Sequence, residues 1–425
     1  MIGHDTFRRV DRWLGVPACA ALTLLRRAYR FVRPSTASVG TAAPKHVLFV
    51  QLAESGSMVL ADPALRALGA WTGARTCCVT FARNVGSLAI TATLSGENVF
   101  LIRTGSAAEL VRDACRFLVW VRRREIDAIV DGELFTRLTA VLCVLTGVRR
   151  RVGFHRFDGA GLYRGDLYSH PVAFDPGRHM AQNYLRLVDA LLPPAVDAAP
   201  APPETAEAPR IEPRNVSPAE LYAVRGKLAA RVGSLSSARL VLVNANASEM
   251  LPQRRWPPAH FAALIRDVLA EFGDVHVLLI GADEDAATTA AIAADVGDAR
   301  CADVAGLFTL AELPALFSLS ALLVSNDSGP AHFAAVSVLP VIALFGPETP
   351  SLFRPLGNAA VISAGLPCSP CVNAGNQRRT RCKDNQCMKR ITVAQVFAAA
   401  RAVLLAGGAS RPPGFIDGRG AGAEA

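Results

Sequence analysis

The stretch Ser325–Gly357, SNDSGPAHFAAVSVLPVIALFGPETPSLFRPLG, follows the apolar run ALFSLSALLV and contains a second apolar run, LPVIALFG. This order predicts a strand, a tight glycine-containing loop, a helix and a second strand. Backbone N–H groups at such a helix start are unpaired and attract phosphate. Asp327 and His332 flank these amides and can hydrogen-bond a ribose hydroxyl or a phosphate oxygen. The stretch predicts a phosphate-binding loop, with a capped helix that buries His332 as the alternative.

The same stretch resembles the C-terminal signature of glycosyltransferase family 9, the bacterial lipopolysaccharide heptosyltransferase-like enzymes. That signature reads N-D-[ST]-G-P-x-H, then a helix, then P-V-[VI]-A-L-F-G-P, and it falls here on Asn326–His332 and Pro340–Pro347. The resemblance extends to most of residues 45–400. It implies the α/β fold called GT-B, in which two Rossmann-like doubly wound parallel-sheet domains face a central cleft.

The implied activity is inverting transfer of a heptose or hexose. The donor would be a nucleotide-diphosphate sugar such as ADP-heptose, and the acceptor an acidic envelope glycolipid of the lipopolysaccharide type. The resemblance implies no catalytic metal. It places the protein in the cytoplasm, peripheral at the inner face of the cytoplasmic membrane.

The alternation of apolar runs and helical segments supports this fold independently of the resemblance. A chain of 425 residues suits two domains better than one core. Val47–Leu52 reads as a buried strand, followed by a glycine-containing turn and a helix over Met58–Leu68, which is how a doubly wound unit begins. A helix is also expected over Glu133–Thr146, and the pattern restarts at Leu240–Asn244.

Composition shifts predict five segments. They are a basic amphipathic arm and linker at 1–44, an acceptor domain at 45–195, a Pro/Ala-rich linker at 196–215, a nucleotide-sugar domain at 216–408 and a disordered tail at 409–425.

The net charge of +9 favours acidic partners. Nucleic acid is not expected, because the basic runs contain no interleaved aromatics and no binding module is recognisable.

The run WLGVPACAALTLL at 13–25 lies between arginines and is too short to span a membrane. We expect an amphipathic helix on an anionic membrane surface, with a helix packed on the domain and a signal peptide as alternatives.

The loop NANASEMLPQRRWP at 244–257 follows a predicted strand, where doubly wound folds bind ligands. Arg254 stands where the family has Lys and can clamp a diphosphate. Trp256 is expected in the core. An acid in Gly281–Asp285 would, by resemblance, bind the ribose or base, unless these acids only solvate a helix start. The predicted nucleotide-sugar site comprises Asn246, Ser248, Arg254, Glu284, Asp327, Ser328, Gly329 and His332.

Sugar transfer with inversion needs a base for the acceptor hydroxyl. In family 9 this base is generally the Asp of R-L-G-x-[IL]-G-D, whereas residues 51–57 read QLAESGS, with Ser57 at the Asp position. Glu54 in the same turn is the candidate base, unless it only caps the following helix. Asp131 or Glu133 is a second candidate, because both follow the predicted strand Ala128–Val130. If no base exists, the chain is a non-catalytic protein of this fold that binds a sugar nucleotide or glycan.

Four cysteines form the cluster CSPC–x10–C–x4–C, at Cys368, Cys371, Cys382 and Cys387. The spacing suits a structural Zn²⁺ site. Disulfides, free thiols or a redox- or metal-sensing device are the alternatives. The remaining cysteines are expected to be buried small hydrophobes, namely Cys19, Cys77, Cys78, Cys115, Cys143 and Cys301.

Overall fold

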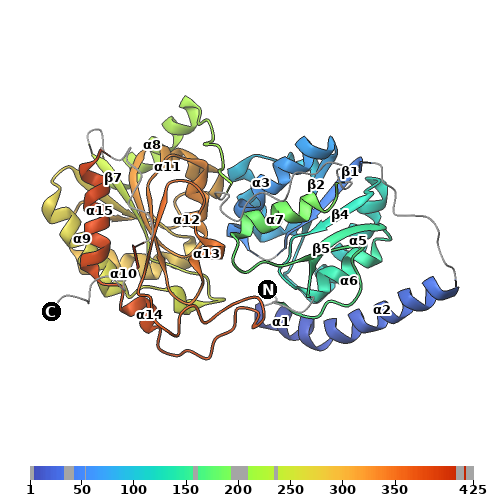
Figure 1. Ribbon diagram of the computed structural model, residues 1–425. Coiled ribbons are helices and arrows are strands. Elements are labelled where there is room, and N and C mark those ends of the chain that lie inside the picture. The colour runs from blue at the N-terminus through green and yellow to red at the C-terminus, as the bar shows by residue number, and fades with distance from the viewer. Residues whose placement is uncertain are drawn as a thin grey trace, which may run out of the picture. The chain divides into compact units, whose positions relative to one another are not determined.

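The computed structural model describes residues 4–32, 43–52, 54–156, 161–192, 209–233, 238–407 and 416–417. The chain divides into two compact units (Figure 1). Unit 1 comprises residues 1–88 and 92–209, and unit 2 comprises residues 89–91 and 210–425. Each unit has a parallel sheet with helices on its faces, so the predicted α/β class is confirmed. Residues 34–42 and 196–208 of the predicted linkers lie outside the described residues.

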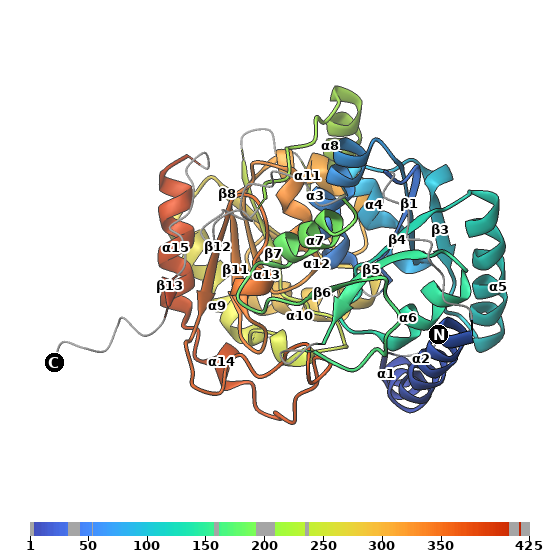
Figure 2. The same ribbon diagram turned by 45° about the vertical axis from the view of Figure 1, so that its right-hand side comes forward.

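Unit 1 has a six-stranded sheet in the order β3-β2-β1-β4-β5-β6, with every neighbouring pair parallel. Its strands are β1 (His46–Val50), β2 (Arg75–Phe81), β3 (Val99–Ile102), β4 (Ala128–Asp131), β5 (Arg150–His155) and β6 (His170–Ala173). Helices on both faces bury the central strands, which explains their unbroken apolar runs. Figure 2 shows α3 (Ser55–Thr72) and α7 (Met180–Asp189) on one face, and α5 (Ala107–Arg123) and α6 (Arg137–Leu145) on the other. Helix α4 (Val85–Thr91) lies between β2 and β3 in sequence.

The helices α1 (His4–Trp13) and α2 (Gly15–Val32) lie along the outside of α6 (Figures 1 and 2). Asp11 caps α6 from another helix, because its carboxylate accepts hydrogen bonds from the amides of Arg137 at 2.7 Å and Leu138 at 3.0 Å. The same carboxylate pairs with the Arg137 guanidinium at 3.1 Å. On α2, Thr23 Oγ1 accepts from the Asp166 amide at 2.9 Å. The two helices are thus fixed to unit 1.

A fully buried ion pair holds β4 to the loop before β6. Asp131 and Arg164 are both 0% exposed, and the Arg164 guanidinium donates to Asp131 Oδ2. Tyr168 Oη donates to the same oxygen at 2.7 Å, while Asp131 Oδ1 accepts from the Glu133 amide at 3.0 Å. Burial alone would lower the pKa of Arg164, but Asp131 and the other acidic neighbours raise it above its ordinary value.

Unit 2 has a seven-stranded parallel sheet in the order β13-β12-β11-β10-β7-β8-β9. Its strands are β7 (Arg239–Asn244), β8 (Val275–Leu279), β9 (Cys301–Asp303), β10 (Ser320–Asn326), β11 (Val341–Phe345), β12 (Ala359–Ser363) and β13 (Ile416–Asp417). One face is covered by α9 (Pro258–Glu271), α10 (Ala286–Val296) and α15 (Val393–Leu405). The predicted core residue Trp256 is 0% exposed in this layer. The remaining helices of the unit are α8 (Pro218–Val232), α11 (Leu313–Ser318), α12 (Gly329–Phe333), α13 (Pro350–Phe353) and α14 (Gln386–Lys389).

Three sequence-based expectations were wrong. The helix expected from Glu133 begins only at Arg137, because Phe135 has a left-handed φ of 61° that a helix cannot contain. Ile416–Asp417, in the tail predicted to be disordered, forms β13 and pairs with the otherwise open edge of β12; the rest of that tail lies outside the described residues. Cys115 is exposed, because it lies on the outer side of α5.

The buried pair makes a stability prediction. Asp131→Asn leaves the Arg164 charge uncompensated in the core, so the opening free energy of unit 1 should fall by about 3–5 kcal/mol. Hydrogen-exchange mass spectrometry of β4 and β5 peptides measures this free energy. The matched control is Asp274→Asn, which breaks the exposed pair of Asp274 with Arg239. It should leave exchange in the unit 2 core unchanged. Equal protection of β4 in the Asp131 variant would contradict the assigned role.

Candidate active site

The carboxyl ends of the unit 2 strands carry most of the predicted site residues. From β7 the chain proceeds outward to β8 and β9, and then returns to β10 and continues to β11 and β12 on the other side. The strand order therefore reverses between β7 and β10, which is where open doubly wound sheets bind ligands. In the register, Asn244 lies beside Ser325 and Leu344 beside Asn326. The loops after β7 and β10 consequently start next to each other.

Two buried asparagines connect these loops. Asn326 Oδ1 accepts from the Trp256 amide at 3.0 Å, and Asn326 Nδ2 donates to the Ala245 carbonyl at 2.8 Å. Asn244 Nδ2 donates to Ser328 Oγ at 2.7 Å and to Ser325 Oγ at 3.0 Å. Sequence reasoning did not assign these roles, although both residues end buried strands of the pattern.

Arg254, Asp327 and His332 form a buried charged group at this edge. Arg254 Nη1 lies 3.5 Å from Asp327 Oδ2, and His332 Nε2 lies 3.9 Å from Asp327 Oδ1. Their exposed fractions are 7%, 3% and 7%, respectively. Arg254 Nε and Asn246 Nδ2 have no hydrogen-bond partner among the residues that the structure describes. Buried donors of this kind are uncommon and call for an explanation, of which a bound ligand is one.

The start of α12 adds backbone donors. Ser328, in the N-cap position, has an extended backbone, but its side chain makes no capping hydrogen bond to α12. Its hydroxyl instead accepts from Asn244 and donates to the Asn326 carbonyl at 3.3 Å. A capping side chain here would bond the Ala331 amide, because Pro330 has no N–H, and the Ser328 hydroxyl is turned away from it. The Gly329 amide, at the first position of α12, is one that N-capping side chains do not usually satisfy and is therefore suited to an anion.

Two predicted residues are not part of this group. Ser248 is exposed, and its hydroxyl accepts from the Met250 amide at 3.1 Å in a local turn. Glu284 is also exposed. The neighbouring Asp285 is half-buried, its carboxylate accepts from the Ala282 amide at 2.9 Å, and burial raises its pKa. A Cβ on Gly281 would touch both Asp285 and Asn246, so Asp285 lies close to Asn246.

A further pair at this edge was missed. Glu348, three residues after the end of β11, is 2% exposed, and its Oε2 lies 3.2 Å from Arg378 Nε. The Arg378 guanidinium stacks 4.4 Å from the Phe353 ring centroid. Gln377 and Arg378 have left-handed φ values of 54° and 55°, which are uncommon for residues with a Cβ. No spacing in the sequence signals this contact.

Of the four clustered cysteines, Cys368, Cys371 and Cys382 lie in the loop after β12 and Cys387 lies in α14; this segment contacts the loops of the site. Gln253 Nε2 donates to the Cys382 carbonyl at 3.1 Å, and the amide of Cys371 donates to the Pro347 carbonyl at 3.0 Å. Burial raises the pKa of the Cys387 thiol to about 11, and nearby Cys371, Cys382 and Cys368 act in the same direction. Among the described residues, which include all four cysteines, no three metal-ligating side chains form a ready-made metal site.

In unit 1, the turn after β1 is held by side chains from two other loops. Glu133 Oε1 accepts from the Leu52 amide at 2.6 Å, and Asn84 Nδ2 donates to the Leu52 carbonyl at 2.7 Å. Ser57 is buried in the first turn of α3. Glu54 is half-buried at the N-cap position, but its side chain makes no capping hydrogen bond, contrary to the alternative considered above.

Arg83 is an electrostatic neighbour of this turn. Burial lowers the pKa of the Arg83 guanidinium, and the charges of Glu54 and Glu133 oppose that shift. Asp131, the second candidate base, has both oxygens engaged inside the core by Arg164, Tyr168 and the Glu133 amide. This geometry favours a structural role for Asp131, whereas Glu54 in the turn after β1 is only half-buried.

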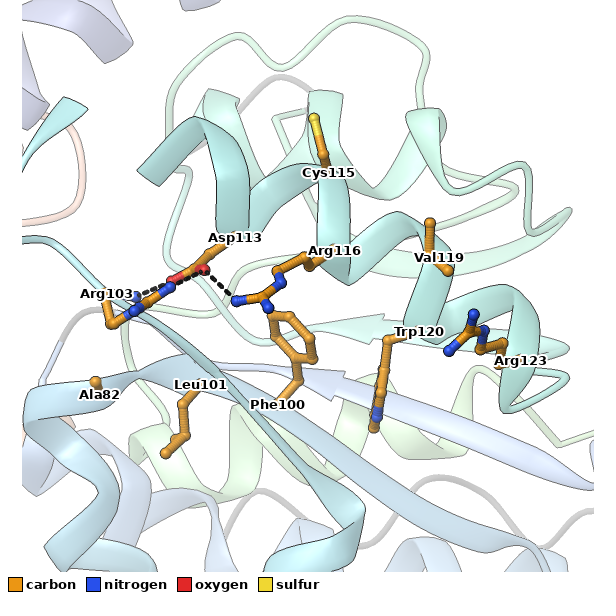
Figure 3. A pocket seen from close by; sticks show the side chains of 10 residues that line it. All are labelled: Ala82, Phe100, Leu101, Arg103, Asp113, Cys115, Arg116, Val119, Trp120 and Arg123. Atoms are coloured by element: carbon orange, nitrogen blue, oxygen red, sulfur yellow. Dashed lines mark hydrogen bonds and ion pairs between the residues drawn. The ribbon is translucent and has the colours of Figure 1, made fainter. Parts of the chain in front are cut away.

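A separate cavity of about 770 Å³ lies between β3 and α5 of unit 1 (Figure 3). Phe100 and Trp120 lie side by side in it, with ring centroids 5.5 Å apart. Arg103, which pairs with Asp113, borders the cavity together with Arg116. The cavity contains none of the predicted site residues.

Comparison with known proteins places the chain in a family. The family model described as glycosyltransferase family 9 (heptosyltransferase) matches residues 121–380, more than half of the chain. Lipopolysaccharide heptosyltransferase 2 of Escherichia coli is 33% identical over 130 residues, which are 30% of this chain and 37% of that protein. Lipooligosaccharide heptosyltransferase 2 of Haemophilus ducreyi is 35% identical over 120 residues, 27% and 34% of the two chains. The matched segments thus span about a third of these relatives.

Solved structures agree in fold. The E. coli ADP-heptose lps heptosyltransferase II has a TM-score of 0.64 at 21% identity, covering 85% of this chain and 99% of that chain. The E. coli heptosyltransferase WaaC with ADP has a TM-score of 0.56 at 17% identity, covering 84% and 99%. No helix in the described residues is long and apolar enough to cross a membrane. The structural likeness confirms the GT-B fold, and the match to the family model shows that this chain belongs to glycosyltransferase family 9.

Proposed function

We propose that this chain transfers a heptose, with inversion, from ADP-heptose to an acidic envelope glycolipid of the lipopolysaccharide type. The observation that carries the proposal is the buried group at the strand-order reversal of unit 2, with Arg254 and Asn246 presenting unused donors beside the start of α12. The family match and the relatives named as heptosyltransferases support the choice of sugar and acceptor.

Unit 2 would hold the donor. Arg254 and the amide at Gly329 would bind the diphosphate, and they would stabilise the negative charge that develops on the leaving nucleotide. Asp327 orients the Arg254 guanidinium through their ion pair, and His332 adds a second polar contact to Asp327. Asn246 and the half-buried Asp285 would contact the nucleoside. No catalytic metal is required in this scheme, because Arg254 and backbone donors supply the positive potential.

Unit 1 would supply the base. Glu54 would accept the proton of the acceptor hydroxyl as that oxygen attacks the anomeric carbon and the nucleoside diphosphate leaves. Its turn is held by Glu133 and Asn84, which would keep the carboxylate in place. Arg83 beside it would face the acidic acceptor. Ser57, at the usual Asp position, favours the rival function of a protein that binds sugar nucleotides without transfer.

The protein would work at the cytoplasmic face of the membrane, because its donor is a cytoplasmic nucleotide sugar and its acceptor is anchored in lipid. The cysteine cluster would hold a structural Zn²⁺ through Cys368, Cys371, Cys382 and Cys387. Its support is the spacing of the four cysteines in the sequence. Such a metal would fix the loop that contacts Gln253 and Pro347 on either side of the donor site.

Arg254→Gln tests the donor site. Removing a charge-assisted contact to phosphate costs about 1.5–3 kcal/mol, so Kd for ADP-heptose should rise about 10- to 100-fold. Isothermal titration calorimetry measures this change. Arg266→Gln is the control, because Arg266 pairs with Asp295 on the surface. An unchanged Kd in the Arg254 variant would remove this residue from the site.

Glu54→Gln tests the base. Loss of a general base should lower kcat by about 10²–10⁴-fold while donor binding stays within about twofold. Initial rates of transfer to purified glycolipid measure kcat, and Glu97→Gln, on an exposed pair of unit 1, is the control. Full activity in the Glu54 variant would exclude this base. If the unaltered protein binds ADP-heptose but transfers no sugar from any nucleotide donor, the rival function is correct.

Metal analysis tests the cysteine cluster. Purified protein should contain about one Zn²⁺ per chain, and Cys368→Ser with Cys371→Ser should lose it. Chelation should lower Tm of the unaltered protein. The control is Cys115→Ser, which removes an exposed thiol far from the cluster in sequence. Metal-free protein with an unchanged Tm on chelation would contradict the site.

A further inference from the structure

Helix α2 exposes a continuous apolar face. Leu24 and Leu25 are each 66% exposed, Phe31 is 89% and Val32 is 75%. Along the helix this face continues at intervals of three and four residues, at Pro17, Ala21, Leu24, Leu25, Ala28, Phe31 and Val32. Residues at these intervals lie on one side of a helix. Isolated exposed leucines are ordinary on protein surfaces, but a full stripe of apolar side chains is not.

The opposite face of α2 is already used. Gly15, Cys19 and Thr23 are buried at intervals of four residues, and this side packs on α6. Adding a Cβ to Gly15 would bring it within 2.7 Å of the Arg137 side chain, so the helix lies close to α6 there. Arg26 donates to the Asp166 carbonyl at 2.6 Å. The exposed stripe is therefore directed away from α6, on the outer side of unit 1.

The charges around the stripe indicate its partner. The sequence of α2 contains no Asp or Glu, and its exposed Arg27 lies at the border of the stripe. The exposed Arg12 lies in the last turn of the preceding helix, α1. A basic helix with one apolar face is typical of insertion into the interface of an anionic bilayer. A second copy of this chain is a poorer fit, because two such faces would bring arginines together. Since no described helix can span a membrane, α2 would lie in the membrane plane.

We infer that α2 inserts its outer face into one leaflet of an anionic membrane and thereby anchors unit 1. Apolar insertion supplies most of the binding, and the arginines contribute attraction to anionic headgroups. The inference deepens the proposed function, which rests on a membrane-bound acceptor, because it assigns the contact to named side chains. The capped and ion-paired junction of α1 with α6 transmits this anchoring to the sheet of unit 1.

Vesicle co-sedimentation tests the inference with the full chain. The variant is Leu24→Gln with Leu25→Gln, which removes apolar surface without adding a negative charge that would itself repel anionic lipid. Binding to vesicles of phosphatidylglycerol and phosphatidylethanolamine should fall at least about tenfold. The control is Tyr222→Gln with Leu405→Gln, two apolar side chains of unit 2 that are 82% and 60% exposed. It should bind as the unaltered protein does.

Vesicle binding in high salt and a measurement of self-association distinguish insertion by α2 from electrostatic adsorption and from dimerisation. Binding of the unaltered protein should persist in 0.5 M NaCl, roughly a concentration at which electrostatic attraction alone is screened. Loss of binding in salt, or equal binding by the Leu24/Leu25 variant, would overturn insertion by α2. Insertion would also be overturned if the unaltered protein bound no vesicles but formed a dimer in sedimentation velocity, and if the Leu24/Leu25 variant were a monomer. The Kd for ADP-heptose should be unchanged in the variant, so a failed donor site and a failed anchor give different results.

Discussion

The candidate donor site depends on one constraint: the loops after β7 and β10 must start side by side and stay there. The parallel register brings the strand ends together, and the carboxamides of Asn244 and Asn326 then connect the two loops through buried hydrogen bonds. Because these groups are out of water, leaving one unpaired is costly, so the arrangement is specific. Arg254 and Asp327 lie at opposite ends of this connection, which is why a cation and an anion separated widely in sequence meet at 3.5 Å.

Unit 1 uses comparable carboxylates for a different purpose. Asp131 ends β4 and Asp327 directly follows β10, yet the Asp131 carboxylate is bound in the core by Arg164 and Tyr168. Glu133 holds the turn after β1 by accepting from the Leu52 amide. Removing Asp131 or Glu133 would therefore disturb the local structure of unit 1 more than the proton transfer proposed for the turn after β1. Glu54 differs because it is half-buried and makes no capping hydrogen bond.

Much of the fold could be predicted because strands buried on both faces leave unbroken apolar runs, and the run Leu240–Asn244 lies within β7 (Arg239–Asn244). The loop around Asp327 could be predicted because its polar residues stand between two such apolar runs. What sequence could not supply was side-chain direction. Ser248 and Glu284 follow strands, as site residues should, but local turns expose them. The contacts of Glu348 with Arg378 and of Asp131 with Arg164 join loops at irregular spacings, so no periodicity reports them.

The most direct test of the account is a crystal structure of this chain with ADP-heptose. The account predicts the diphosphate between Arg254 and the start of α12, within hydrogen-bonding distance of the guanidinium and of the Gly329 amide, with the nucleoside toward Asn246. Nucleotide bound elsewhere, with Arg254 and Asn246 still lacking a ligand, would contradict the claim that the reversal of strand order in unit 2 forms the donor site.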